Sequence, residues 1–135
     1  MSVSPDEKLT RFIRYGDHFS EVTNRVKHHA FLPKKNEVDL SVFRISGLSD
    51  TDVWTLGREH AQGEGKPIKA RADLLASNVY ENNLKVIADG QGHERHATIT
   101  PFPIEIEATP TDRKVRRATA ARLADASELR IMPTE

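Results

Sequence analysis

Residues 38–45, with the sequence VDLSVFRI, constrain the fold more than any other segment. Val42, Phe43 and Ile45 are β-branched or aromatic, and Gly47 ends the run. Such a run predicts a strand, and its apolar content places the strand near the centre of a sheet.

The residues that follow carry a helix-start signature. Ser49 is a typical N-cap, and Asp52 stands three positions later, where a capping box has its acidic member. We therefore predict a helix from Asp50 to about His60, or one that ends a turn earlier because Gly57 weakens it.

Four further segments read as strands, and one remains open. Residues 68–74 alternate apolar with charged side chains, which indicates a half-exposed strand. Pro101 and Pro103 either end the strand predicted near residues 96–102 or place it at a sheet edge. Short strands are also predicted at residues 84–87 and 128–132. Residues 9–33 fit a short helix or strand, a turn and a second short element equally well.

A second long helix is predicted over residues 111–126, where Thr111 is a plausible cap and alanine is frequent. Its apolar face is narrow, so we expect it to lie on the sheet, and residues 77–83 favour a short helical turn. The fold class is therefore α+β: a single mixed or antiparallel sheet of four to six strands with two or three helices. One domain is expected over residues 9–132, between flexible tails at 1–8 and 133–135.

Composition excludes several classes of protein. The 135 residues include no cysteine, which excludes a disulfide framework, cysteine-based zinc sites and a thiol nucleophile. The chain has 20 Lys and Arg residues and 20 Asp and Glu residues, so its net charge does not favour binding to nucleic acid or to a membrane. No run approaches the ~18 apolar residues of a membrane span, and the polar N-terminus shows no signal peptide. We expect a cytoplasmic protein without a membrane partner.

The charges are nevertheless spread unevenly. Residues 8–35 carry seven basic and two acidic side chains, and residues 111–126 carry five and two. Residues 36–60 carry five acidic and two basic ones. The two basic segments would form a face suited to phosphate if they lay side by side. Alternatively, they pair with the acidic middle of the chain.

Arg44 is the most informative single residue because it interrupts the best predicted strand. It shares a face with Leu40 and Val42, while Phe43 and Ile45 point the other way. A guanidinium at this position is buried and paired, lines a pocket, or is exposed to solvent at a sheet edge.

The six histidines include two local groups, His28 with His29 and His93 with His96. No His-Glu-x-x-His spacing is present, so no metal site and no cofactor are expected. His96 is a candidate general base or polar pocket wall, and its alternative is a simple hydrogen bond to a backbone carbonyl.

Other chemical motifs are weak. No nucleophile-elbow pattern surrounds Ser41, and GEGKP at residues 63–67 lacks the spacing of a phosphate-binding P-loop. Aromatic residues interleave with basic ones over residues 11–31, a mixture that stacks bases in some proteins but more often reflects core packing.

Three short motifs occur in order: Ala30-Phe31-Leu32-Pro33, Leu40 to Arg44 with the sequence LSVFR, and His96-Ala97-Thr98-Ile99. In this order the chain resembles a family of small uncharacterised bacterial proteins with AFxP, LSV[FY]R and HAxI motifs and no known function. The resemblance implies a bacterial single-domain protein. It also implies that Phe31, Ser41, Arg44 and His96 lie near one another, in a common site or a common core.

Three functional hypotheses follow. The first is a non-catalytic binding or accessory protein that recognises an anionic partner, which is a protein, a nucleotide or a nucleic acid. The second is a small enzyme acting on a phosphate-bearing or nucleotide-like substrate, in which Arg44 holds the anion and His96 moves a proton. The third is a structural or self-associating subunit, a homo-oligomer. The candidate ligand-binding residues are Arg44, His96, Arg25 and Phe31.

Overall fold

A six-stranded antiparallel sheet organises the chain, in the order β6-β7-β4-β1-β5-β8. The computed structural model describes residues 3–34, 37–62, 65–102 and 110–133, with side chains in the last range from Arg113. The strands, in chain order, are β1 (Lys8–Ile13), β4 (Leu40–Arg44), β5 (Ala70–Leu75), β6 (Lys85–Ile87), β7 (His96–Thr100) and β8 (Glu128–Ile131). The predicted fold class, α+β with a single sheet and two or three helices, is confirmed.

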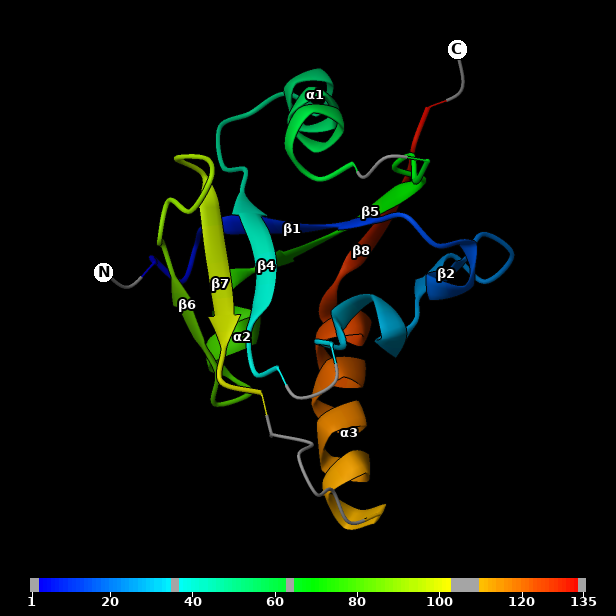
Figure 1. The fold of residues 1–135 in the computed structure, drawn as a ribbon, viewed down its shortest axis with the longest axis vertical. Helices are drawn as coiled ribbons and strands as arrows, with labels where there is room; N and C mark the ends of the chain where they lie inside the picture. Colours follow the sequence, from blue (N-terminus) through cyan, green and yellow to red (C-terminus); the bar gives the residue numbers. More distant parts are fainter. Residues whose placement is uncertain (1–2, 35–36, 63–64, 103–109, 134–135) are drawn as a thin grey trace.

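Three α-helices and several short elements complete the described part of the chain. The helices are α1 (Asp50–His60), α2 (Ala76–Tyr80) and α3 (Pro110–Ala126). A small hairpin of β2 (Phe19–Ser20) and β3 (Arg25–Val26) lies between two 3-10 helices, η1 (Gly16–His18) and η2 (His28–Phe31). Figure 1 shows α1 and α3 at opposite ends of the molecule.

The two faces of the sheet have separate apolar clusters. Leu9 and Val42 point into the larger one, which also receives Phe31 of η2 and Leu123 of α3. On the other face, α1 covers one end of the sheet and packs Val53, Trp54 and Leu56 against Phe12 and Phe43. Alternation along each strand therefore decides which cluster a side chain joins.

Both predicted long helices exist, and α1 has the expected start, but α3 begins one residue before the predicted range and packs differently from the expectation. The Ser49 side chain accepts the backbone N–H of Asp52 at 3.2 Å, which is the N-cap bond predicted for α1. The narrow buried face of α3 packs chiefly against η2 rather than on the sheet. The side chain of the predicted cap Thr111 and the tail residues 134–135 lie outside the described residues, and α3 begins at Pro110, so Thr111 is not the residue that precedes the helix.

Gly57 is favoured in α1 by a close approach that the sequence does not reveal. A Cβ added there would lie 2.5 Å from the Phe12 ring. We expect Gly57→Ala to lower the free energy of unfolding by about 1–3 kcal/mol through overpacking, despite the better helix propensity of alanine. Denaturant unfolding measures this loss. Gly16→Ala is the control because a Cβ there meets nothing closer than Lys69 Nζ at 4.0 Å. A gain of stability in Gly57→Ala would contradict the prediction.

The strand at residues 70–75 corrects the expectation of a half-exposed strand. Residues Ala70 to Leu74 are all buried, because β5 lies between β1 and β8 with packed elements on both faces. Its two charged members, Arg71 and Asp73, are 1% and 3% exposed. Their opposite charges make this burial tolerable.

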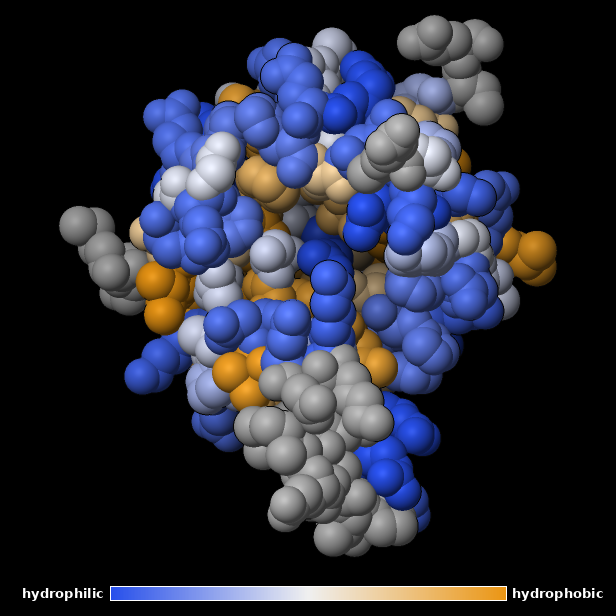
Figure 2. All heavy atoms as spheres, in the orientation of Figure 1, coloured by the Kyte–Doolittle hydropathy of each residue, from blue (hydrophilic) through white to orange (hydrophobic). Residues whose placement is uncertain are grey.

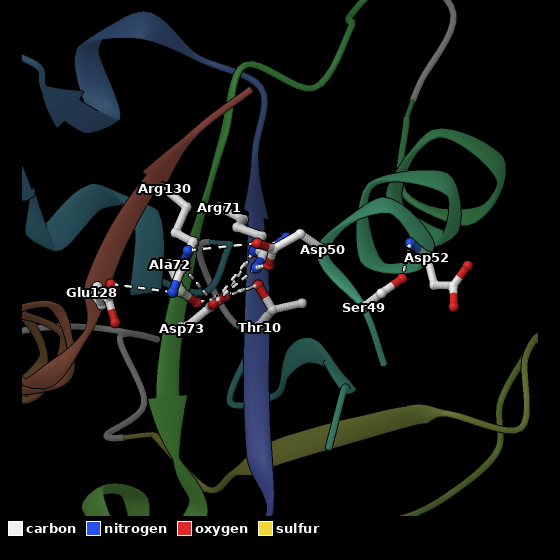
Figure 3. A network of polar contacts seen from close by, with 9 residues as sticks. All are labelled: Thr10, Ser49, Asp50, Asp52, Arg71, Ala72, Asp73, Glu128 and Arg130. Atoms are coloured by element: carbon white, nitrogen blue, oxygen red, sulfur yellow. Dashed lines mark hydrogen bonds and ion pairs between the residues drawn. The ribbon is translucent and has the colours of Figure 1, made fainter. Parts of the chain in front are cut away.

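Figure 3 shows the network around these two residues. Arg71 Nε donates to Asp73 Oδ1 at 3.1 Å, and Arg71 Nη2 donates to Asp50 Oδ1 at 2.7 Å. Thr10 donates its hydroxyl to Asp73 at 2.7 Å, and the Arg71 guanidinium lies 4.7 Å from the centre of the Trp54 ring. The hydrogen bond from Arg71, and then its charge, lower the pKa of Asp50. Because Asp50 and Trp54 belong to α1, the network fastens that helix to the sheet.

The N-terminal segment also differs from the flexible tail predicted over residues 1–8. Val3 is buried, and its carbonyl accepts a hydrogen bond from the Tyr80 hydroxyl. The carbonyl of Glu7 accepts the N–H of Ala76, and β1 begins at Lys8. Residues 3–7 therefore belong to the packed domain.

Candidate functional site

The candidate site is a pocket that opens where β1 and β4 separate. These two strands pair only at Leu9 with Arg44 and at Thr10 with Phe43, whereas β1 pairs with β5 along its whole length. Beyond Thr10 the sheet therefore splits into two halves, and Figure 1 shows β1 crossing behind β4 at a steep angle. The space between the halves is a pocket of about 540 Å³. Sites for small organic ligands have this size.

Two kinds of polar side chain line this central pocket, over an aromatic wall of Phe12 and Phe43. One end carries Arg11, Arg14, Tyr15, His18 and Lys34, and the other carries His60, His93 and His96. In Figure 2 a depression in the middle of the visible face has both hydrophilic and hydrophobic atoms inside it. Such a mixture suits a ligand with a charged group and an apolar part.

Arg11 dominates the cationic end. Its side chain reaches into the gap between the separating strands, where Nε donates to the Ala30 carbonyl at 3.1 Å and Nη1 donates to the Ser41 carbonyl at 2.9 Å. Burial, and then the charge of Arg14, lower the pKa of Arg11 to about 10, so it stays protonated at neutral pH. Among the described residues no carboxylate forms an ion pair with it. Its positive charge is thus held by neutral groups.

Tyr15 lies among positively charged side chains at this end. Lys66 Nζ donates to its hydroxyl at 3.0 Å, and the Arg14 guanidinium lies 5.9 Å from its ring centre. The hydrogen bond from Lys66, then the charges of Lys66, Arg14 and Lys34, lower the pKa of Tyr15. Nearby, burial lowers the pKa of His18, against the charge of Asp17. Both shifts favour the less positive form of the side chain.

Two carboxylates, Glu37 and Asp39, also line the pocket. Asp39 accepts the Thr100 hydroxyl, so part of its acceptor capacity is used within the sheet. Against Arg11, Arg14 and Lys34, these two acids leave one formal positive charge on the lining when the histidines are neutral.

The other end is built around a hydrogen-bonded histidine and aspartate. His96 Nδ1 lies 2.6 Å from Asp89 Oδ1, and the Thr98 hydroxyl donates to Asp89 Oδ2 at 2.6 Å. Although burial raises it, the pKa of Asp89 is lowered by hydrogen bonds from His96, Thr98 and the Gln91 backbone. Asp89 is therefore ionised at neutral pH and accepts from the Nδ1–H of the imidazole.

His93 and His60 complete this end. The His93 Nδ1 accepts the backbone N–H of Arg95 at 3.0 Å, and the His60 ring centre lies 4.5 Å from that of His93. Phe43 touches His96 edge-on, with ring centres 5.5 Å apart and planes at 90°, and it also packs against His93 at 6.2 Å. One aromatic ring therefore positions both imidazoles.

Of the four residues predicted to bind a ligand, the structure places only His96 in this pocket. Arg44 lies on the opposite face of the sheet, because it pairs with Leu9 whereas His96 pairs with Phe43. Its Nη2 donates to the Glu94 carbonyl at 2.8 Å, and its side chain is 29% exposed beside Glu7. Phe31 is fully buried in the larger apolar cluster. The sheet thus separates Arg44 from His96.

Ser41 and Arg25 lie in different surroundings. Ser41 lines the central pocket, as does His96. Arg25 forms an exposed ion pair with Asp125 of α3 at 3.0 Å and lines a separate shallow depression with Lys27, His28 and His29. The two basic segments do lie side by side here, since η2 and β3 contact α3. Part of their charge is paired between the two segments, by Arg25 with Asp125.

Sequence reasoning did not single out most residues of this site as ligand-binding, and among those it missed are Arg11 and Asp89. Arg11 looks like an ordinary exposed member of an alternating strand, and nothing local shows that β4 leaves β1 at that point. For Asp89, a weak signal exists: the turn at residues 89–92 precedes a strand that begins with His96. The turn brings the start of its loop back beside that strand.

Within the described residues, no group of three or more His, Cys, Asp or Glu side chains is arranged to hold a metal ion. None of the helices in the same part of the chain is long and apolar enough to cross a membrane. The resemblance to bacterial proteins with AFxP, LSV[FY]R and HAxI motifs stays a prediction. Comparisons with protein-family models, with curated proteins and with solved structures find no match for this chain.

Proposed function

We propose that this protein binds a small phosphate-bearing ligand in the central pocket. The observation that carries the proposal is Arg11, a partly buried cation that faces the pocket and has only neutral protein acceptors among the described residues. Burying a charge without a counter-charge is costly, and an anionic ligand would supply that counter-charge.

Three features favour a phosphate group on a small molecule over a large anionic partner. Arg14 lies near Arg11, and Lys34 lines the same pocket, so several charge-assisted hydrogen bonds to an anionic ligand are available. The wall of Phe12 and Phe43 offers apolar area to a ring or an alkyl group. By contrast, Arg25 on the exposed basic surface near α3 is already paired with Asp125. A nucleotide-like ligand has both a phosphate and a ring.

A direct binding measurement tests this proposal. We expect isothermal titration calorimetry to detect binding of inorganic phosphate and, more tightly, of adenosine 5′-monophosphate, and to detect much weaker binding of uncharged adenosine. Raising the salt concentration should weaken the binding of the two anions and leave the binding of adenosine unchanged. Absence of binding by both anions at low salt would overturn the proposal.

The variant Arg11→Gln locates the site. A charged hydrogen bond contributes about 1.5–3 kcal/mol, so we expect the affinity for adenosine 5′-monophosphate to fall by about ten- to a hundredfold. Arg25→Gln is the matched control, since Arg25 lies outside the pocket, and it should bind like the wild type. Arg14→Gln serves if Arg11→Gln does not fold. If the Arg14 and Arg25 variants lost affinity for adenosine 5′-monophosphate equally, the effect would be one of overall charge and would not locate the ligand in this pocket.

A further inference from the structure

We propose that the central pocket is a catalytic site for phosphodiester hydrolysis, with His96 Nε2 as the general base, Asp89 as its positioning residue and His93 Nε2–H as a fixed donor to the phosphoryl oxygen. The inference rests on the proposed binding of a phosphate-bearing ligand and adds a reaction to it. It depends on which ring nitrogens of the two histidines carry a proton.

The hydrogen bond to Asp89 sets the tautomer of His96. A carboxylate only accepts, so His96 Nδ1 must donate across the 2.6 Å contact. In the neutral imidazole the proton is then on Nδ1, and Nε2 is a free acceptor. Among the described residues no hydrogen-bond partner is found for Nε2, although His96 is 8% exposed and lines the pocket. Nε2 is therefore available to a water molecule or a ligand in the pocket.

His93 has the opposite tautomer. A backbone N–H only donates, so His93 Nδ1 accepts from Arg95 and carries no proton. The proton of the neutral ring is therefore on Nε2, which makes this nitrogen a donor. The pocket thus contains one imidazole that accepts a proton and one that donates a hydrogen bond.

The surroundings hold this arrangement in place. Asp89 is anchored from two further sides, by the Thr98 hydroxyl and by the Gln91 backbone N–H at 3.1 Å. Phe43 packs against both imidazole rings. Catalysis is most effective when its groups are oriented before substrate binds.

The proposed reaction balances with water as the only co-reactant. His96 Nε2 takes a proton from water as the water oxygen attacks phosphorus, and the bond from phosphorus to the leaving oxygen breaks. The imidazolium, stabilised by Asp89, returns that proton to the leaving oxygen, giving a phosphomonoester and an alcohol. His93 Nε2–H donates to a phosphoryl oxygen, and the positive charge of Arg11, Arg14 and Lys34 favours an anionic substrate in the pocket.

The charge of the lining favours a diester over a monoester. Three cations against two carboxylates leave one positive charge, which matches the single charge of a phosphodiester. A monoester such as adenosine 5′-monophosphate brings close to two negative charges, so it binds through the same cations but leaves the lining with an excess negative charge.

The activity test uses bis(4-nitrophenyl) phosphate, a dinucleotide and a cyclic mononucleotide as diesters. We expect the wild type to hydrolyse at least one of them and to be much slower on 4-nitrophenyl phosphate. His96→Gln should lower kcat by at least a hundredfold. His93→Leu should lose more activity than His93→Gln, because glutamine keeps an N–H donor. His28→Gln, outside the pocket, is the matched control and should behave as the wild type.

The outcomes separate this inference from the function it rests on. If the wild type binds adenosine 5′-monophosphate but hydrolyses none of the three diesters, the catalytic inference fails and the binding function stands. If the wild type binds no anion, the binding function itself fails. Hydrolysis that survives His96→Gln would also overturn the inference.

A measurement on the unmodified protein avoids any folding defect in the variants. Nitrogen-15 NMR of the imidazoles should show His96 in the Nδ1–H form and His93 in the Nε2–H form at a pH where both are neutral. In Asp89→Asn, the His96 tautomer should lose its preference and kcat should fall more than KM changes. The reverse tautomers in the wild type would overturn the assignment of base and donor.

Discussion

Replacing Asp73 with alanine is expected to lower the free energy of unfolding by about 3–5 kcal/mol, which is the cost of breaking a buried ion pair on one side. Arg71 would keep its charge while almost fully buried, with only Asp50 left as a charged hydrogen-bond partner among the described residues. Thr10 would lose its acceptor on Asp73 as well. Denaturant unfolding followed by circular dichroism measures the loss.

Two comparisons make this prediction specific to burial. Asp125→Ala removes an exposed ion pair with Arg25 and should cost less than about 1 kcal/mol. The double variant Arg71→Met with Asp73→Leu removes both charges and should be more stable than Asp73→Ala, because no unpaired charge stays buried. If Asp73→Ala does not fold, Asp73→Asn supplies the same comparison. Equal costs for Asp73→Ala and Asp125→Ala would contradict the role of the network.

Phe31→Ala is expected to cost about 3–5 kcal/mol, as large-to-small substitutions of buried aromatic residues do. Phe31 is fully buried between the sheet and α3, and η2, to which it belongs, is the main packing partner of that helix. The cavity would therefore weaken the attachment of α3 as well as the core. The same unfolding measurement applies.

The controls for Phe31 also decide whether it belongs to the core or to a binding site. Phe31→Leu should cost less than about 1.5 kcal/mol because much of the volume is kept. Val22→Ala, at a position that is 97% exposed, should change stability by less than about 0.5 kcal/mol. Unchanged stability of Phe31→Ala together with lost binding of adenosine 5′-monophosphate would place Phe31 in the site instead.

Much of the secondary structure follows from local chemistry. The run around Val42 and Phe43 predicts a central strand, and Ser49 with Asp52 predicts the start of α1; both are found. Pro101 and Pro103 predict either the end of a strand or an edge position, and β7 stops at Thr100 while lying between β6 and β4. Each of these signals acts between residues that are close in the chain, so these elements can be predicted from the local sequence.

Burial of charged residues could not be predicted in the same way. Arg71 and Asp73 alternate with apolar residues, which is typical of a half-exposed strand. They are buried because β8, from the end of the chain, pairs with β5 and because α1 brings Asp50 and Trp54 over them. No local pattern announces these partners.

The candidate site likewise contains residues that could be predicted from the sequence and residues that could not. His96 could be singled out from its residue type and its position at the start of a strand. Arg44 could be singled out as well, but strand alternation turns it to the other face of the sheet, away from His96. Arg11 and Asp89 acquire their surroundings only when β1 separates from β4 and the turn after residue 89 folds back.

The sequence by itself determined the α+β class, the central strand and the start of α1, because hydrophobic alternation and capping act between near neighbours. Only the tertiary structure decided that Arg11 faces an open pocket without a carboxylate partner among the described residues, and that Asp89 orients His96. Charge pairing and hydrogen bonding depend on distances in space, and here those distances join residues that lie far apart along the chain.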